Sequence, residues 1–139
     1  KNNIETIWKA DKQMNSDLLI LVAEDDDSNF KLIKAIIGKK CDIQWAKNGE
    51  EIVALFKEYG NEAKAILMDI KMPVMNGLDA TKIIRGENKE IPIIMQTAYA
   101  FSSDKENAMN AGASEVLVKP ITLSILRNTL TKYFPELVW

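Results

Sequence analysis

The sequence of 139 residues contains no histidine, and this absence excludes several kinds of site at once. Without imidazole there is no Ser-His-Asp or Cys-His catalysis, no histidine-bound zinc and no histidine general base. The single cysteine, Cys41, excludes an internal disulfide and is typical of a reducing compartment. Any chemistry must therefore use carboxylates, hydroxyls, amines or a bound metal.

Long apolar runs and an excess of charge of one sign are also missing. The longest unbroken apolar run, 18–23, is too short to span a membrane, and no charged-then-apolar leader opens the chain. The net charge of -2 gives no reason to expect nucleic acid or an anionic membrane as a partner. We therefore expect one cytoplasmic domain, and because the chain begins with Lys1 we expect it to be a segment of a larger parent.

Short apolar runs alternate with helix-length amphipathic segments along most of the chain. Strands that are apolar on both faces and alternate with helices indicate a parallel sheet covered by helices on both sides. The pattern predicts a doubly wound α/β domain over residues 18–134, after an extension or linker (1–17) and before a short tail (135–139). The predicted strands are 18–23, 42–45, 65–68, 92–96 and 115–118.

Helix-start and helix-end signals separate the predicted strands. Asp26 and Asp27 lie where capping of the first helix requires acids, and Ser103 with Glu106 forms a capping-box pattern. The last helix is predicted over 122–133. Four glycines lie where helices are expected to end in a left-handed residue: Gly38, Gly60, Gly86 and Gly112.

Polar side chains follow four of the five predicted strands. Glu24 and Asp25 follow the first strand, Asp69 ends the third, Thr97 the fourth and Lys119 the fifth. Taken singly, each has a structural explanation as a cap, a turn residue or a solvated strand end. Because ligands of open parallel sheets bind outside the carboxyl ends of the strands, the joint pattern predicts a site there.

The chemistry of this predicted site follows from its residue types. Three carboxylates at one edge repel one another unless a cation joins them, and hard oxygen ligands without thiolate or imidazole favour Mg²⁺. Lys119 and the Thr97 hydroxyl would face an incoming anion. A nucleophilic aspartate, Mg²⁺, a lysine and a hydroxyl are together the parts for moving a phosphoryl group onto a carboxylate.

Four segments, LVAEDD, LMDIKMPVMNGLDA, IIMQTAYA and VLVKP, occur in this order and at suitable spacings. Together they resemble the receiver domain of two-component response regulators, and the resemblance covers residues 18–134. It implies a flavodoxin-like fold of five parallel strands in the order 2-1-3-4-5. It also implies a phosphoacceptor domain that switches its partner interactions in a phosphorelay.

The resemblance assigns metal-binding roles to four positions. Asp69 would be the phosphoacceptor, and Asp25 with Asp69 would bind Mg²⁺ directly, joined by the backbone carbonyl of Lys71. Glu24 would act on the metal through water.

Further positions would contact the phosphoryl group. Thr97 would be the switch hydroxyl, assisted by the backbone N–H of Ala98, and Lys119 would form an ion pair with it. The bond before Pro120 would be cis, as is usual in the family. The donor would be a phosphohistidine on a histidine kinase or a histidine phosphotransfer domain, in agreement with the absence of histidine here.

This chain departs from the family where an aromatic residue usually precedes the lysine by three positions. Val116 stands there, which argues against signal output through a rotating ring but leaves the phosphorylation chemistry unaffected. The positions two past Asp69 and Thr97 tune phosphoryl lifetime in the family. Lys71 and Tyr99 are larger than an open path for water needs, so we predict slow self-dephosphorylation.

The segments EDDDSN and MPVMNGLDAT resemble receivers attached to hybrid sensor histidine kinases, and such a parent could itself be anchored in a membrane. The domain would catalyse its own phosphorylation and dephosphorylation without being a separate enzyme. Only PELVW follows the last predicted helix, so we expect no attached DNA-binding segment. Partner contacts, including a homodimer, are expected through the fourth helix, fifth strand and fifth helix, roughly 103–133.

Three other functions share parts of this pattern. A flavodoxin-type cofactor binder needs a Gly/Ser/Thr phosphate loop after the first strand, where this chain has four acids. A phosphatase of the haloacid dehalogenase type has an Asp-x-Asp pair, whereas Lys71 lies two residues after Asp69. A receiver-like module that docks partners without being phosphorylated stays open, and Val116 favours it.

Overall fold

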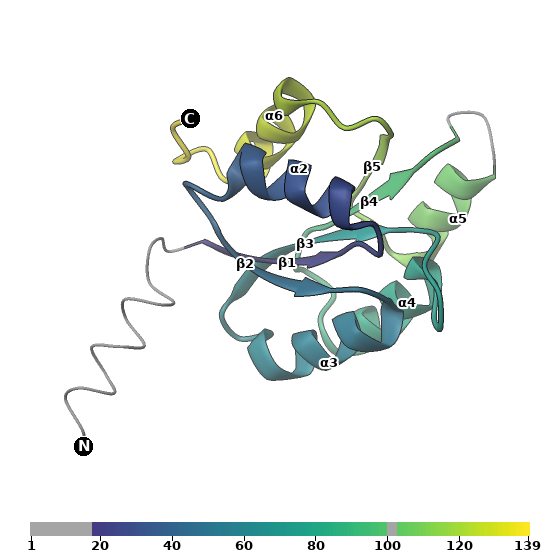
Figure 1. The fold of residues 1–139 in the computed structure, drawn as a ribbon. Helices are drawn as coiled ribbons and strands as arrows, with labels where there is room; N and C mark the ends of the chain where they lie inside the picture. Colours follow the sequence, from purple (N-terminus) through teal and green to yellow (C-terminus); the bar gives the residue numbers. More distant parts are fainter. Residues whose placement is uncertain (1–17, 100–102) are drawn as a thin grey trace, which may run out of the picture.

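The computed structural model describes residues 18–99 and 103–139, so the predicted extension over 1–17 lies outside the described residues. Its centre is a five-stranded parallel sheet in the order β2-β1-β3-β4-β5, which confirms the predicted fold (Figure 1). Each observed strand lies within two residues of its predicted bounds. The strands are β1 (Leu19–Ala23), β2 (Asp42–Ala46), β3 (Ala63–Asp69), β4 (Ile93–Thr97) and β5 (Glu115–Val118).

Helices cover both faces of the sheet and bury its central strands, while the edge strands β2 and β5 are only partly buried. In Figure 1, α2 and α6 lie over one face, while α3 and α4 lie over the other. Ile20 and Val22 of β1 belong to the core on the α2 and α6 side, and Leu21 and Ala23 belong to the opposite core, which also includes Ala108 of α5. The helices are α2 (Asp27–Ile37), α3 (Gly49–Tyr59), α4 (Gly77–Glu87), α5 (Asp104–Ala111) and α6 (Leu123–Tyr133).

Most helices begin at a side-chain cap. Asp26 caps α2, where one of its carboxylate oxygens accepts from the backbone N–H groups of Ser28 at 2.7 Å and Asn29 at 3.1 Å. The predicted capping box at Ser103 and Glu106 is wrong. Ser103 already has helical dihedral angles (φ -67°, ψ -4°), and its hydroxyl makes no capping hydrogen bond in the part of α5 that the structure describes. The other side-chain caps are Asn48 of α3, Asn76 of α4 and Thr122 of α6.

Only one of the four glycines assigned to helix ends is left-handed. Gly112 has φ 116° and follows α5, where the Nε of Arg85 donates to its carbonyl at 2.8 Å. Gly38 and Gly60 keep right-handed dihedral angles, and Gly86 lies inside α4. The predicted left-handed conformation is therefore wrong for three of them: Gly38 and Gly60 follow α2 and α3 with right-handed angles, and α4 continues past Gly86 to the extended Asn88.

The tail after α6 packs back onto the domain. The indole Nε1 of Trp139 donates to the Thr131 hydroxyl at 2.9 Å, and the Arg127 guanidinium lies 5.1 Å from a Trp139 ring centroid. Leu137 and Trp139 pack against the core beneath α2 and α6, while Val138 points outward. Every helix within the described ranges is too short or too polar to traverse a bilayer.

Candidate functional site

The carboxyl edge of the sheet brings three acids together. β1 and β3 are neighbours with Ala23 opposite Met68, so the residues that follow β1 lie beside the end of β3. Glu24, Asp25 and Asp69 each place a carboxylate oxygen within 4.8 Å of the others. The grouping predicted from the strand ends is therefore present.

Glu24 is fully buried at this edge, although its side chain carries an acid. Its Oε2 accepts from the Asp26 backbone N–H at 3.2 Å, and its backbone carbonyl accepts from the indole of Trp45 at 2.8 Å. Its Oε1 has no hydrogen-bond partner among the described residues. Burial, and next the charge of Asp69, raise the pKa of Glu24 to about 7. A buried carboxylate oxygen that accepts no hydrogen bond and lies among other acids fits a hard divalent cation.

Lys119 reaches the acids from β5. Its Nζ lies 2.7 Å from Asp69 Oδ2 and 3.7 Å from Glu24 Oε1, and it follows β5 at the same edge of the sheet. Burial alone would lower the pKa of this lysine, but the hydrogen bond to Asp69 and the nearby negative charges raise it on balance. The Lys119–Pro120 bond is cis, as predicted.

Thr97 ends β4 and is buried, but its hydroxyl makes no hydrogen bond to Glu24, Asp25 or Asp69 in the described part of the chain. Its Oγ1 donates to Asp104 Oδ2 at 3.1 Å and accepts from the Tyr99 backbone N–H at 3.1 Å. Its backbone carbonyl accepts from the Lys119 N–H at 2.7 Å, which ties the ends of β4 and β5 together. Ala98 follows at the same edge and is exposed.

The loop between β3 and α4 packs against the backbone of Asp69 and Ile70. Gly77 donates its N–H to the Ile70 carbonyl at 2.8 Å, and a Cβ on Gly77 would lie 2.2 Å from the Asp69 carbonyl oxygen. Only glycine fits that approach. Val74 in the same loop has φ 70°, a region that β-branched residues rarely adopt, and its side chain is exposed. Lys71 is exposed at the start of the loop.

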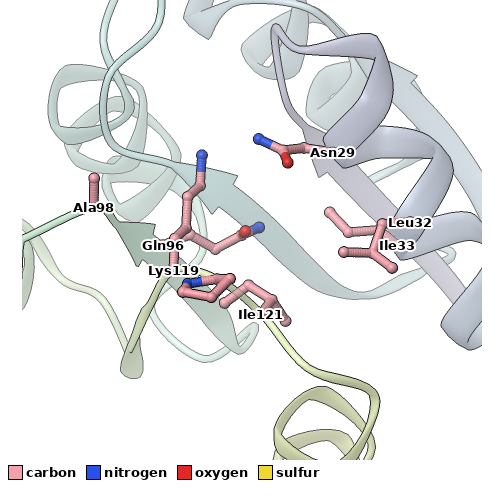
Figure 2. Close-up of a pocket in the computed structure, with 8 residues that line it drawn as sticks. Asn29, Leu32, Ile33, Gln96, Ala98, Lys119 and Ile121 are labelled. Atoms are coloured by element: carbon pink, nitrogen blue, oxygen red, sulfur yellow. The ribbon is translucent and has the colours of Figure 1, made fainter.

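A cavity of about 280 Å³ opens beside these residues, between α2, the end of β4 and the segment after β5 (Figure 2). Gln96 of β4 is only 3% exposed and lines it. Figure 2 shows Asn29 and Leu32 of α2 lining the opposite wall. Lys119 lines the cavity as well as contacting Asp69, so the cavity and the acidic cluster share a wall.

Two polar residues of this region, Gln96 and Asp104, were missed by the sequence reasoning. Gln96 was detectable, because a polar residue interrupts the apolar strand IIMQT. Asp104 carries no comparable signal, since its contact with Thr97 depends on the path of the chain between β4 and α5. Val116 packs half-buried against the core that includes α3 and α4.

Comparison with known proteins places this geometry in a family. A sequence model of the response regulator receiver domain matches residues 20–131. Hybrid signal transduction histidine kinase I of Dictyostelium discoideum is 38% identical over 129 residues, which cover 84% of this chain but 7% of that protein. The chain thus spans only a small part of this relative.

Two solved structures share the fold at 0.78 in TM-score. One is the receiver domain of sensor histidine kinase PA1611 from Pseudomonas aeruginosa, with magnesium in its active site cleft (30% identity, 86% of this chain, 98% of that chain). The other is the Saccharomyces cerevisiae receiver domain of Ssk1 with the histidine phosphotransfer protein Ypd1 (29% identity, 87% of this chain, 92% of that chain). The chain therefore belongs to the response regulator receiver domains of two-component signalling.

Proposed function

We propose that this receiver domain takes a phosphoryl group onto Asp69 with Mg²⁺ bound beside it. The observation that carries the proposal is the group of Glu24, Asp25 and Asp69, in which a buried Glu24 oxygen has no hydrogen-bond partner among the described residues. The positive charge of a divalent ion would offset the negative charges of the three carboxylates, and a phosphoryl group would pair with the positively charged Lys119.

The acids fit Mg²⁺ by their chemistry. Asp25 and Asp69 would bind it directly with the Lys71 carbonyl, and Glu24 would contact it through water. Bound Mg²⁺ would offset the negative charge that gathers on the phosphoryl oxygens during transfer. Asp25 is exposed whereas Glu24 and Asp69 are buried, so the ion would be reached from solvent through Asp25.

The transfer itself would use the Asp69 carboxylate as nucleophile. A P–O bond forms to Asp69 as the P–N bond of the donor phosphohistidine breaks, and the imidazole leaves with that electron pair. Lys119, already 2.7 Å from Asp69, would follow the phosphoryl oxygens as an ion pair. The Thr97 hydroxyl and the Ala98 N–H would donate hydrogen bonds to the same oxygens.

The donor would be a histidine kinase or a histidine phosphotransfer domain that covers the cavity. Lys119 contacts Asp69 and also lines the cavity beside Gln96, so a protein that covers the cavity would lie next to Asp69. The likeness to a receiver solved with a phosphotransfer protein supports this partner class. The apolar wall at Leu32, which is 45% exposed, suits a protein surface.

The larger context is proposed from the relatives. A hybrid histidine kinase parent, with 18–134 as its receiver, agrees with the match to hybrid kinase I. Exposed Met109 of α5 and Val118 of β5 support a homodimer or output surface on α5, β5 and α6. A cytoplasmic location stays a prediction.

Mass spectrometry after incubation with Mg²⁺ and a small acyl phosphate tests the proposal. One phosphoryl adduct is expected, lost in Asp69→Asn and kept in Asp79→Asn, a control that changes an exposed acid in the first turn of α4. An adduct that persists in Asp69→Asn overturns the assignment. No adduct from any donor would favour the module that docks without being phosphorylated.

Metal binding is tested separately by unfolding. Mg²⁺ at about a hundred times its dissociation constant should raise the free energy of unfolding by about 2.7 kcal/mol. Asp25→Ala should abolish this gain, while Asp79→Asn should retain it. An equal gain in Asp25→Ala would contradict the ligand set.

A further inference from the structure

The hydroxyl proton of Thr97 is already committed in this structure. Thr97 Oγ1 donates to Asp104 Oδ2 at 3.1 Å, and its lone pair accepts from the Tyr99 N–H at 3.1 Å. A hydroxyl has a single proton to donate. While it bonds to Asp104, Thr97 therefore cannot donate to a phosphoryl oxygen at Asp69.

Asp104 lies where it can hold that proton firmly. It is the first residue of α5, half-buried, and a carboxylate is favourable at the N-terminus of a helix. A hydrogen bond to a carboxylate is stronger than one between neutral groups, and Thr97 is only 2% exposed, so water competes little for it. The bond joins the end of β4 to the start of α5.

We infer that Asp104 is a positioning residue that holds the Thr97 hydroxyl in the unphosphorylated state and competes with the phosphoryl group for its proton. The inference rests on the proposed phosphorylation of Asp69. Phosphorylation must break the Thr97–Asp104 bond before Thr97 can serve the phosphoryl group. Asp104 thereby sets how far the unphosphorylated state is favoured, and the released carboxylate passes the change to α5.

A purely structural role for Asp104 at the start of α5 is the competing explanation. Asp104→Ala removes the acceptor, and Asp104→Asn keeps a neutral acceptor of the same shape. Glu106→Gln is the matched control, because Glu106 is an exposed acid in the same first turn. Thermal unfolding of each variant shows that it is folded.

The first measurement is affinity for beryllofluoride with Mg²⁺, a tetrahedral analogue of the phosphoryl group. Asp104→Ala should bind it more tightly by about ten- to a hundredfold, the range that corresponds to one hydrogen bond to a charged group. Asp104→Asn should show a smaller gain, and Glu106→Gln none. In a Thr97→Val background, Asp104→Ala should lose its effect, because the proton in dispute is gone.

The second measurement needs no phosphoryl analogue. Scalar couplings of Thr97 should report one χ1 rotamer in the wild type and averaging in Asp104→Ala. A single unchanged rotamer in Asp104→Ala overturns the inference. The inference is also overturned if Asp104→Ala binds beryllofluoride no more tightly than the wild type does. It is overturned as well if Asp104→Ala still tightens binding in the Thr97→Val background. Failure of the proposed function would look different from failure of this inference. In that case Asp69→Asn would still bind beryllofluoride or still be phosphorylated.

Discussion

Lys71 and Tyr99 meet at the mouth of the site, where the Lys71 ammonium lies 4.9 Å from the centroid of the Tyr99 ring. Lys71 follows β3 and Tyr99 follows β4, so the contact links the two loops that flank Asp69. Tyr99 is 54% exposed, and Lys71 is exposed as well. We predict that these side chains narrow the path by which water would reach an acyl phosphate at Asp69.

We predict that Lys71→Asn and Tyr99→Ala each shorten the lifetime of the phosphoryl group. An exposed cation–π contact contributes about 0.5–1 kcal/mol, which corresponds to about two- to fivefold in rate. Decay of the acyl phosphate after removal of the donor measures the effect. Lys82→Asn, which removes an exposed charge from α4, should leave the decay unchanged. Equal lifetimes in all variants would refute the prediction that Lys71 and Tyr99 slow the loss of the phosphoryl group.

Gln96 offers a test of how a protein donor docks. Gln96→Met keeps the length of the side chain but removes the amide that lines the cavity. We expect phosphotransfer from a protein donor to this variant to require a higher donor concentration. A polar group of the donor that is buried against Met instead of the Gln96 amide would lose its hydrogen bond, which weakens binding by about 1–3 kcal/mol.

Transfer from a small acyl phosphate provides the internal comparison for Gln96→Met, since such a donor does not cover the cavity. Gln44→Met on the edge strand β2 is the matched control. An equal slowing with both donors would mean that Gln96 acts on the structure of the site instead.

Gly77 and Gly86 lie in the same helix and should respond oppositely to alanine. A Cβ at Gly77 would lie 2.2 Å from the Asp69 carbonyl oxygen, whereas a Cβ at Gly86 meets nothing within 4 Å. Gly77→Ala should lower the free energy of unfolding by about 1–3 kcal/mol and slow phosphorylation. Gly86→Ala should raise it by about 0.4–1 kcal/mol. Urea unfolding measures both, and a tolerated Gly77→Ala would contradict the packing.

The Glu115 carboxylate gives the fold a pH dependence in acid. Hydrogen bonds from Lys132 (2.9 and 3.1 Å) and Tyr133 (2.9 Å) lower the pKa of Glu115 below its ordinary value of 4.5, against a smaller opposing effect of burial. A lowered pKa in the folded state means that the stabilisation is present above pH 4.5 and is lost as pH falls through the folded value.

Lys132→Met should therefore flatten the fall of the free energy of unfolding between about pH 5 and pH 3. Lys64→Met, which removes an exposed charge from β3, should keep the slope of the wild type. An unchanged slope in Lys132→Met would show that the contact with Lys132 does not lower the pKa of Glu115 in the folded state.

The sequence predicted the sheet and the acids at its edge because both follow from local pattern. Apolar runs bounded by polar residues identify strands of a buried parallel sheet, and the carboxyl ends of such strands meet at one edge. Glu24, Asp25, Asp69 and Lys119 therefore came together as expected. The roles assigned to them by resemblance stay predictions.

Helix ends were less predictable from composition. A capping residue works only if its own backbone leaves the helical region, and Ser103 does not. A glycine permits a left-handed end without requiring one, so Gly86 could lie inside α4. Both errors arise because a residue type sets what is allowed, while the neighbouring chain decides what is adopted.

The sequence by itself determined the fold, the order of the strand ends and the set of carboxylates, because periodicity and residue chemistry are properties of short segments. Tertiary structure alone decided that the buried Glu24 keeps an oxygen without a hydrogen-bond partner in the described chain, that Gln96 opens onto a cavity, and that Asp104 holds the Thr97 hydroxyl. These features depend on side chains brought together by the path of the loops, and no local pattern encodes which acceptor a hydroxyl will find.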